Sequence, residues 1–485
     1  MSGDYITVAN STFTNNTSVS IGGGLLVYGL NCNTFNCNFT GNHVNGLGGA
    51  MYFYPRAVNS TLTDSNFIGN TANEAGGGVY WDCANNNMTN CNFKNNYAPK
   101  GANLYWTWTV EEFLNKYDQI HDYDYVFILN GVGTPSRTIV LNKKGVIISG
   151  QSTNVIFDAK GGNVHFEVTG EGVLIEKITF RNFNFTGNGG AILWSGNNGT
   201  LKNCNFNNNT ANFGGAVRWN GINGNLIGST FTNNNANHGG GVTWNGANGK
   251  LTDSTFINNT AIANGAGIGW GGVNGTIINS TFINNIAHNI GGGILVYNSD
   301  CNLFNSYFAG NSANGGGGGV SWGGTNGKLT DSTFINNSAR YGGGVDWFYL
   351  NGYLSGCTFN GNNAHDGAGI FWHNEQGNPT TPFIIADSTF TNNNAITHGG
   401  AIYLRDSCSM INCTFINNKW VKSNGIYANN GLTINGGKGI VDIITNNTLS
   451  GASIIVLNNE TYYYPPNTNI NFKEKIISKK IGFIK

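Results

Sequence analysis

The sequence predicts an all-β fold, namely a right-handed parallel β-helix with three short strands in each turn of about 25 residues. A Phe-x-x-Asn tetrad recurs at a nearly constant spacing, and a Gly-Gly-Gly/Ala-aliphatic block follows it in most repeats. Such a period is typical of a solenoid, because one turn cannot bury its apolar face until neighbouring turns stack on it. The tetrads begin at Phe13, Phe39, Phe67, Phe93, Phe206, Phe231, Phe256, Phe282, Phe308, Phe334, Phe359, Phe390 and Phe415.

The first strand of a turn follows the glycine block, as residues 239–259 illustrate. Val242 and Trp244 are two positions apart, so their side chains lie on one face of a strand and that of Thr243 lies on the other. Asn248-Gly249 then predicts a corner, because both residues tolerate a positive φ. Parallel pairing of each strand with its equivalent in the next turn follows from the repeat.

The second and third strands lie between Gly249 and the next glycine block. Leu251 marks the second strand, Asp253 a corner, and Phe256 an inward position on the third strand. We expect the asparagine of each tetrad to turn the next corner while the phenylalanine anchors the strand inward. The corner before the third strand carries a carboxylate or an amide in most turns, which predicts a stacked ladder of these side chains. Its members are Asp64, Asn90, Asn203, Asp253, Asn279, Asp331 and Asp387.

A column of tryptophans occupies one slot of the repeat, two residues after the aliphatic residue that closes the glycine block. Other turns place Val27, Phe53, Val296 or Leu404 in this slot, so we expect it to face the core; an aromatic stripe that binds a ligand is the alternative. The tryptophans are Trp81, Trp194, Trp219, Trp244, Trp270, Trp322, Trp347 and Trp372.

Cysteine usage gives no support for a metal site. Five cysteines, Cys37, Cys91, Cys204, Cys357 and Cys413, lie two positions before the phenylalanine, where other turns carry serine, and we expect them to be small buried residues. Disulfides within a turn stay open for two pairs with a common spacing, Cys32 with Cys37 and Cys408 with Cys413. No Cys-x-x-Cys pair occurs, so zinc is not expected.

The position between the aliphatic residue and the tryptophan should face solvent, and its residues are chemically mixed. If a strand face binds glycans, we expect it to be this one. The candidate binding residues are Tyr52, Tyr80, Arg218, Asp346, Phe371 and Tyr403.

No catalytic signature rises above the repeat. The strongest local candidate is His365-Asp366, just before a glycine block, whereas the other loop histidines, His238, His288 and His398, lie in mostly non-adjacent turns. Glycine runs such as residues 315–319 lack the lysine of a phosphate-binding loop. We therefore expect no catalytic site and no cofactor, with His365 and Asp366 as the alternative.

Composition argues against nucleic-acid binding and against a membrane-spanning segment. The formal net charge is zero and only 10% of the residues are charged, so the basic surface of a nucleic-acid-binding protein is missing. No run of 18 apolar residues occurs, so no membrane span is expected. Because the sequence opens inside a repeat, we expect any secretion signal or wall anchor to lie outside it.

The repeat is interrupted once and fades at its end, which predicts four segments. Residues 1–98 are the last turns of a first stack, 99–137 a connector, 138–430 the main β-helix, and 431–485 a β-rich tail that could begin a truncated domain. In the connector, Thr109 and Glu112 form a capping-box pattern before a helix over 110–120 that would cover an open sheet edge. One rod with an insertion is the alternative.

The pairing of Gly-Gly-Ala-Ile/Val (residues 189–192, 214–217 and 399–402) with Phe-x-x-Asn resembles the repeat of chlamydial polymorphic outer membrane proteins. With its Asn/Thr richness, the chain looks most like the adhesin-like surface proteins of methanogenic archaea. That resemblance implies an extracellular cell-surface adhesin or structural stalk that attaches to glycans or partner cells and is not an enzyme. Because parallel β-helices also host pectate lyases and related enzymes, a polysaccharide lyase or glycoside hydrolase is the alternative.

Overall fold

The computed structural model describes residues 1–373, 383–405 and 408–420, and beyond these only the strands of residues 426–428, 432–439, 443–444, 453–457 and 460–464. These residues form two compact units, which are described separately. Unit 1 comprises residues 1–183 and 192–205, and unit 2 comprises residues 184–191 and the described residues from 206 onward. Parts of the predicted main β-helix and tail, including 374–382 and 465–485, lie outside the described residues.

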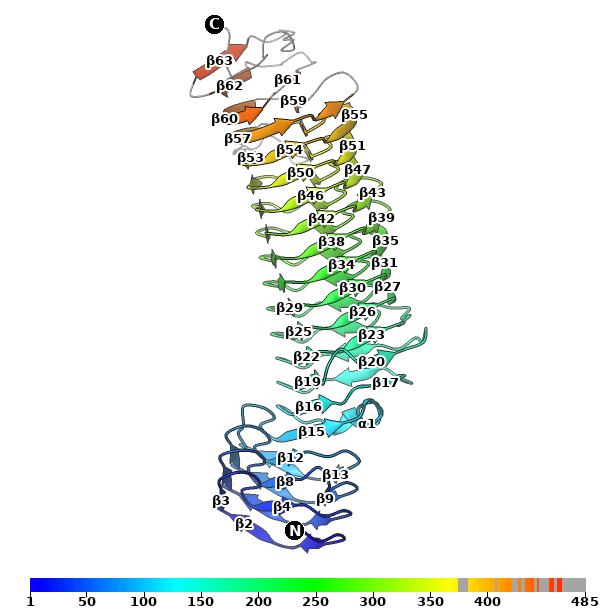
Figure 1. Cartoon of the computed structure of the whole chain (residues 1–485), viewed down its shortest axis with the longest axis vertical. Helices are drawn as coiled ribbons and strands as arrows, with labels where there is room; N and C mark the ends of the chain where they lie inside the picture. Colours follow the sequence, from blue (N-terminus) through cyan, green and yellow to red (C-terminus); the bar gives the residue numbers. More distant parts are fainter. Residues whose placement is uncertain are drawn as a thin grey trace. The chain divides into compact units, whose positions relative to one another are not determined.

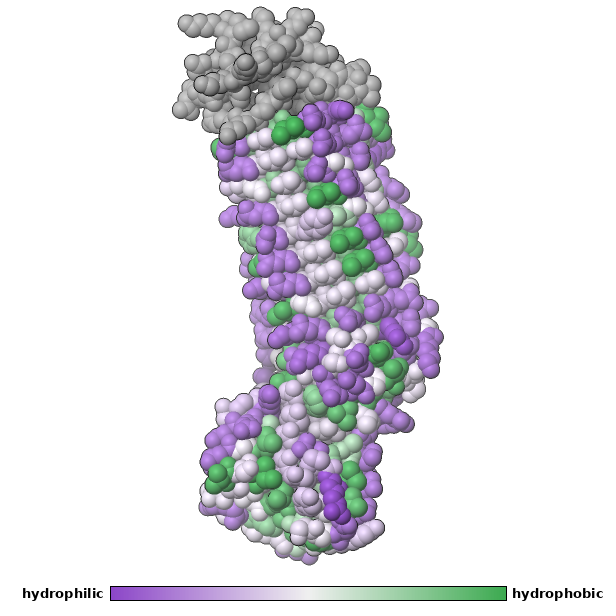
Figure 2. Space-filling model, viewed as in Figure 1, coloured by the Kyte–Doolittle hydropathy of each residue, from purple (hydrophilic) through white to green (hydrophobic). Residues whose placement is uncertain are grey.

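The predicted parallel β-helix is confirmed: like strands pair in parallel from turn to turn, with roughly 26 residues per turn (Figure 1). In unit 2, Leu251 pairs with Ile277, and Phe256 with Phe282, each one turn further along. The phenylalanine rings of successive turns stack face to face, with centroids 4.9 Å apart for Phe256 and Phe282. Figure 2 shows hydrophilic side chains over much of the viewed surface, with hydrophobic ones between them in small groups.

Between residues 210 and 420 the turns of unit 2 carry a fourth short strand besides the three that the sequence predicts. This strand occupies the variable stretch before the glycine block, and β35 (Thr260–Asn264) is an example. Its inward residue is a small alanine, Ala261, which pairs with Ala236 and Ala287 of the neighbouring turns. An alanine column gives no hydrophobic alternation in sequence, which is why the periodicity did not reveal this strand.

Four columns of strands build unit 2. After the glycine block come β28 (Val217–Trp219), β32 (Val242–Trp244), β36 (Ile268–Trp270), β40 (Ile294–Val296), β44 (Val320–Trp322), β48 (Val345–Trp347), β52 (Ile370–Trp372), β56 (Ile402–Leu404), β59 (Ile426–Ala428) and β61 (Ile443–Ile444). The next column is β29 (Asn225–Ile227), β33 (Lys250–Thr252), β37 (Thr276–Ile278), β41 (Asn302–Phe304), β45 (Lys328–Thr330), β49 (Tyr353–Ser355), β53 (Phe383–Ala386), β57 (Cys408–Ile416) and β60 (Leu432–Gly439). The phenylalanine strands are β26 (Asn205–Asn207), whose first residue belongs to unit 1, β30 (Thr230–Thr232), β34 (Thr255–Ile257), β38 (Thr281–Ile283), β42 (Tyr307–Ala309), β46 (Thr333–Ile335), β50 (Thr358–Asn360) and β54 (Thr389–Thr391). The short strands are β27 (Thr210–Phe213), β31 (Asn235–His238), β35, β39 (Ile286–Ala287), β43 (Ser312–Ala313), β47 (Ser338–Tyr341), β51 (Asn363–Asp366), β55 (Asn394–His398) and β58 (Lys419–Trp420), and the tail adds the antiparallel pair β62 (Ser453–Leu457) and β63 (Glu460–Tyr464).

Unit 1 opens with the same kind of turn. Its four strand columns there are β1 (Thr7–Ala9), β5 (Asn33–Phe35), β9 (Thr61–Thr63) and β13 (Asn87–Thr89); β2 (Thr12–Thr14), β6 (Asn38–Thr40), β10 (Asn66–Ile68) and β14 (Asn92–Lys94); β3 (Thr17–Ser18), β7 (His43–Val44) and β11 (Thr71–Ala72); and β4 (Leu25–Val27), β8 (Met51–Phe53) and β12 (Val79–Trp81). The later strands are β15 (Leu104–Trp108), β16 (Tyr125–Ile128), β17 (Gly131–Gly133), β18 (Ile139–Leu141), β19 (Ile147–Gly150), β20 (Val155–Asp158), β21 (Phe166–Val168), β22 (Leu174–Glu176), β23 (Thr179–Arg181), β24 (Ile192–Trp194) and β25 (Thr200–Lys202).

One sheet of unit 1 runs through the interruption of the repeat. Strand β12 pairs with β15, β15 with β16, and β16 with β19, all in parallel. The predicted boundary at residue 98 therefore lies inside unit 1. The two units divide the chain elsewhere than the predicted segments do, and the predicted segments stay predictions.

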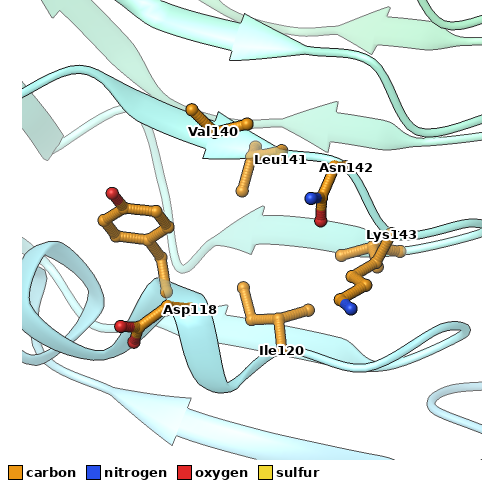
Figure 3. A pocket seen from close by; sticks show the side chains of 8 residues that line it. Asp118, Ile120, Val140, Leu141, Asn142 and Lys143 are labelled. Atoms are coloured by element: carbon orange, nitrogen blue, oxygen red, sulfur yellow. The ribbon is translucent and has the colours of Figure 1, made fainter.

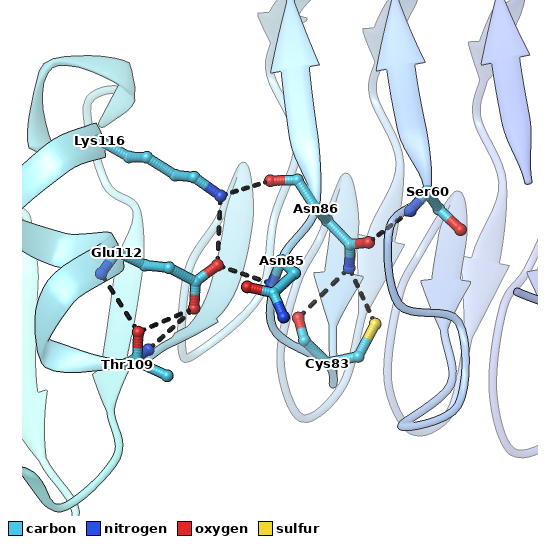
Figure 4. Close-up of polar contacts among 7 residues, drawn as sticks. All are labelled: Ser60, Cys83, Asn85, Asn86, Thr109, Glu112 and Lys116. Atoms are coloured by element: carbon cyan, nitrogen blue, oxygen red, sulfur yellow. Dashed lines mark hydrogen bonds and ion pairs between the residues drawn. The ribbon is translucent and has the colours of Figure 1, made fainter. Parts of the chain in front are cut away.

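The predicted helix is present and covers an edge inside unit 1. It begins as α1 (Val110–Lys116) and continues as the 3-10 helix η1 (Tyr117–Gln119), with the predicted capping box of Thr109 and Glu112 formed. Glu112 also accepts a hydrogen bond from the backbone N–H of Asn85 at 2.6 Å, and Lys116 donates one to the carbonyl of Asn86 at 2.9 Å (Figure 4). Polar groups beside the edge strand β13 are thereby satisfied.

The tryptophan column points into the core, as predicted. All eight tryptophans are at most 1% exposed, and Trp219 and Trp244 stack with their ring centroids 4.6 Å apart. Of the five cysteines predicted to be buried, four are at most 3% exposed, and Cys91 is partly exposed. All nine cysteine thiols are free.

The asparagine of the tetrad has a different role from the predicted one. The left-handed corner is made by the residue before it, since Asn258 has a φ of 53° and Asn284 a φ of 54°. The tetrad residues Asn259 and Asn285 are fully buried instead. Adjacent asparagines fill both positions in many turns, so the sequence did not show which of the two amides lies inside.

Candidate functional site

The candidate site of unit 2 is a row of outward-facing residues, one from the middle of each strand after the glycine block from β28 to β56. We call it the outward row: Arg218, Thr243, Gly269, Leu295, Ser321, Asp346, Phe371 and Tyr403. The sequence predicted that this position faces solvent. That prediction is wrong for most of the row: Asp346 is 5%, Phe371 2% and Tyr403 8% exposed. Side chains of the flanking segments cover these positions. The alternation of inward and outward residues along one strand does not show that such covering side chains are present.

Near its first residues the row forms the floor of a recess of about 250 Å³. Arg218, Thr243 and Gly269 form the floor. One wall consists of Phe213, His238 and Asn264, at the ends of the short strands β27, β31 and β35, and the other of Asn245, Gly271 and Tyr297. Gly269 has no side chain where the next turn carries Leu295, which leaves space in the floor at this point.

Hydrogen bonds and ring contacts fix the walls of this recess. The rings of Phe213 and His238 stack with centroids 5.0 Å apart. Asn264 donates a hydrogen bond to the hydroxyl of Tyr297 at 3.0 Å, which joins the two walls. The hydroxyl of Thr243 donates to the carbonyl of His238 at 2.9 Å. The recess is thus preformed, and aromatic, amide and hydroxyl groups face it.

Burial tunes the charge of the recess. Desolvation lowers the pKa of His238, so this imidazole is neutral at neutral pH. Desolvation also raises the pKa of Tyr297, against a smaller opposing effect of its hydrogen bond with Asn264, and lowers the pKa of the Arg218 guanidinium. Arginine stays charged at these pH values, so Arg218 is the cation of the recess.

At its other end the outward row meets a cluster of histidine, aspartate and aromatic side chains. Asp366 lies between two imidazoles, with 2.8 Å from its carboxylate to Nδ1 of His398 and 3.2 Å to Nδ1 of His365. Asp346 lies 3.5 Å from Nε2 of His373. His398 of the next turn therefore joins the candidate pair His365 and Asp366. The spacing of these residues along the chain did not reveal that His398 contacts Asp366.

Aromatic rings hold this cluster together. Phe371 contacts the rings of Tyr341 and Tyr403, each with a centroid distance of 5.0 Å. The guanidinium carbon of Arg405 lies 5.4 Å from the centroid of Phe371. Of the predicted binding residues, Asp346, Phe371 and Tyr403 thus lie together here, whereas Arg218 lies in the recess.

Tyr52 and Tyr80 belong to unit 1 and form part of a tyrosine ladder: Tyr52, Tyr80, Tyr105 and Tyr125. Tyr52 is 4% exposed, which contradicts the predicted solvent position. The rings of Tyr52 and Tyr80 stack with centroids 5.2 Å apart, and Tyr80 and Tyr105 with 4.3 Å. The hydroxyl of Tyr52 donates to Asp82 at 2.5 Å. Because the ring faces cover one another, little ring surface is left for a sugar to stack on.

A second recess, of about 230 Å³, lies in unit 1 between η1 and β18 (Figure 3). Ile120, Val140 and Leu141 give it an apolar lining, and Asp118 and Lys143 stand at its border. Its lining combines opposite charges with aliphatic groups. Tyr117 is the single aromatic residue of the lining, and the guanidinium carbon of Arg137 lies over this ring, 5.0 Å from its centroid. The recess of unit 2 has the richer set of directional polar groups.

The described residues contain no group of three or more His, Cys, Asp or Glu side chains placed to hold a metal ion. Within the same residues, every helix is too short or too polar to span a bilayer.

Comparisons with known proteins concern the fold. Residues 266–461 match a family model described as a right handed beta helix region. Similar solved structures include a PL6 alginate lyase in complex with a trisaccharide (13% identity, 74% of this chain and 88% of that chain covered, TM-score 0.42) and the Dettilon tailspike protein (13%, 73% and 70%, 0.32). PfbA, a surface adhesin of Streptococcus pneumoniae, is also similar (11%, 87% and 91%, 0.26). No curated protein matches the sequence. Polysaccharide lyases, tailspikes and adhesins share the β-helix fold, and likeness at this level assigns none of their functions to this chain.

Proposed function

We propose that this chain is a glycan-binding protein of the cell surface, an adhesin or stalk, that holds a sugar residue in the recess of unit 2. The observation that carries the proposal is the recess itself, of about 250 Å³, with Arg218 in its floor and amide, hydroxyl and aromatic groups in its walls. Sugars offer hydroxyls to amides and an apolar ring face to aromatic side chains, so this lining suits them. The extracellular location stays a proposal that rests on the resemblance to adhesin-like proteins.

The proposal is tested by glycan-array binding of the whole chain, followed by affinity measurements with a sugar that binds. A Gly269→Leu variant should fill the recess and weaken binding by about tenfold or more. A Cβ built on Gly269 has no heavy-atom neighbour nearer than 3.7 Å, and the next turn carries Leu295 in register, so the variant should fold. Lys250→Met, on the exposed face of β33, is the control. A blank array, or equal binding by Gly269→Leu and the wild type, would rule out this recess as the binding site.

The Asp366 cluster favours a second candidate function, cleavage of a polysaccharide. A carboxylate that holds an imidazole can orient it as a general base, and Asp366 contacts two imidazoles. The side chains of His365 and His398 are 44% and 37% exposed, so both rings are accessible. We rank this function second because it rests on the contacts of Asp366 alone, whereas the recess of unit 2 offers a lined volume for a ligand.

Incubation of the chain with a panel of neutral and acidic polysaccharides, followed by measurement of new chain ends, distinguishes the two functions. A binding protein releases none. An enzyme that depends on the cluster would release chain ends, and Asp366→Asn would remove this activity, whereas Gly269→Leu tests the recess independently. Activity in the wild type would replace the proposed function with the second one.

A further inference from the structure

Arg218 lies in the recess without a negative partner. Its guanidinium carbon lies 5.1 Å from the centroid of the Phe213 ring, and its Nε donates a long hydrogen bond of 3.4 Å to the side-chain oxygen of Asn220. Among the described residues, no carboxylate lies within ion-pair distance of Arg218, and desolvation is the only cause of its pKa shift. Two arginines of unit 1 differ in this respect, because Arg56 pairs with Asp4 and Arg181 with Asp158.

The lining of the recess leaves this charge uncompensated. None of its residues is acidic, and His238 is neutral because of its burial. Asn264 in one wall and Asn245 and Tyr297 in the other supply neutral amide and hydroxyl groups; the Asn245 amide also donates to Asn220 and the Asn264 amide to Tyr297. A partly desolvated cation without a counter-charge is costly, and an anionic group of the ligand would offset that cost.

We propose that the recess selects an acidic sugar, whose carboxylate pairs with Arg218 while its hydroxyls meet the amides of Asn245 and Asn264. This inference rests on the glycan binding proposed above and specifies its ligand class. The planar guanidinium matches a planar carboxylate through two parallel hydrogen bonds, which a neutral hydroxyl cannot reproduce. Gly269 lies two turns from Arg218, with Thr243 between them, and its missing side chain leaves space along the floor for the ring that carries the carboxylate.

Matched oligosaccharides test the inference by calorimetry on the whole chain. The probes are an oligosaccharide of uronic acid residues, the same oligosaccharide after reduction of its carboxyl groups to hydroxymethyl groups, and a neutral oligosaccharide with sulfate esters. We expect the wild type to bind the acidic probe about tenfold or more tightly than the reduced one, because charge-assisted hydrogen bonds are stronger than neutral ones. Its binding should weaken as salt rises.

Variants separate the charge of Arg218 from its shape. Arg218→Met should bind the acidic and the reduced probe equally, whereas Arg218→Lys, which keeps the charge without the planar fork, should retain part of the preference. Lys250→Met removes one positive charge outside the recess and should keep the full preference. Melting curves check that each variant is folded.

The possible outcomes separate the inference about Arg218 from the proposed glycan binding. If the wild type binds the acidic and the reduced probe equally, the inference about Arg218 fails and glycan binding stands. Tighter binding of the sulfate ester than of the carboxylate overturns the assignment of a carboxylate ligand. If Arg218→Met still binds the acidic probe more tightly than the reduced one, another residue recognises the carboxylate and the inference about Arg218 fails. If no probe binds and the glycan array is blank, both the inference and the proposed function fail.

Discussion

At the scale of single residues, buried asparagines are the distinctive polar element of unit 2. The side-chain amide of Asn285 donates to the carbonyl of Phe256 at 3.0 Å and to the amide oxygen of Asn311 at 2.9 Å. Its own oxygen accepts from the backbone N–H and the side-chain amide of Asn259, at 3.0 and 2.9 Å. Each buried amide is therefore satisfied only through the turns on both sides.

Asn285→Ala should destabilise the protein by about 3 kcal/mol or more, because it leaves several buried donors and acceptors of Asn259, Phe256 and Asn311 without partners. Chemical denaturation measures the change. The adjacent Asn284, which makes the left-handed corner, is the matched control: Asn284→Gly should change stability by less than about 1 kcal/mol, since glycine adopts a positive φ readily. Equal effects of the two substitutions would show that the buried ladder is not a special source of stability.

The glycine of each Asn-Gly corner makes room for the tryptophan of the same turn, which its sequence neighbours do not reveal. The sequence predicted a corner at Asn248-Gly249 because both residues tolerate a positive φ, and of the two only Asn248 has one, with a φ of 57°. A Cβ on Gly249 would lie 2.3 Å from Nε1 of Trp244, so the indole excludes any side chain there. Where the inward slot holds the smaller Val296, the equivalent position holds Cys301.

A double-mutant cycle tests this pairing. Gly249→Cys should cost about 1 to 3 kcal/mol alone through overpacking, and Trp244→Val about 3 kcal/mol through a cavity. The double variant reproduces the Val296 and Cys301 combination and should cost less than the sum of the two single changes. Additive costs in denaturation experiments would contradict the packing explanation.

At the scale of elements, the sequence predicted most of what lies inside a turn and little of what lies between turns. Strand order, the inward tryptophans and the capped helix follow from parity, spacing and the pair Thr109 and Glu112, which are local signals. The recess depends on Phe213, Asn264 and Tyr297, which come from different turns, and on the missing side chain of Gly269. Those side chains are neighbours only after the turns stack, so no single-turn pattern contains them.

The tyrosine ladder of unit 1 makes one element sensitive to alkaline pH. Desolvation is the largest effect on Tyr80 and, together with the negative charge of Asp82, raises its pKa to about 12; burial also raises the pKa values of Tyr52 and Tyr105. A folded-state pKa above the unfolded value of about 10 means that this contribution to stability is fully present below pH 10 and is lost as pH rises toward 12.

Unit 1 should therefore lose stability between pH 10 and 12, and Tyr80→Phe should reduce that loss. Phenolate absorbance and denaturation at stepped pH measure both effects. The exposed Tyr97, changed to phenylalanine, is the control for the loss of one tyrosine hydroxyl outside the ladder. If the phenolate signal lost in Tyr80→Phe titrates near the ordinary tyrosine pKa, the ladder does not protect its hydroxyls.

At the scale of the whole molecule, stability is built from contacts between neighbouring turns. Within unit 2 each strand pairs with its equivalents one turn away, as Leu303 does with Ile277 on one side and Leu329 on the other. In such a solenoid the free energy of unfolding is approximately a sum over turns and the interfaces between them. A whole turn can then be deleted without changing the pairing of the remaining turns. Deletion of a fraction of a turn changes that pairing.

Deletion of residues 303–328 removes one complete turn, because Leu303 and Leu329 occupy equivalent positions. The Phe, Trp and Asn columns stay in register across the new junction, so the variant should fold, with the melting temperature only modestly lowered. The recess beside Arg218 is built from residues 213–297 and should keep its affinity for any sugar that the wild type binds.

Deletion of residues 303–315, half a turn, is the contrasting variant. It moves Gly316 into the position of Leu303, which pairs with Ile277, and Ser321 into the position of Phe308. Inward side chains of the following strand then fall at outward positions, and the phenylalanine column is interrupted. We expect this variant to be unfolded by circular dichroism and to aggregate on size-exclusion chromatography. If both deletions fold equally well, or both fail, register between turns is not what specifies this fold.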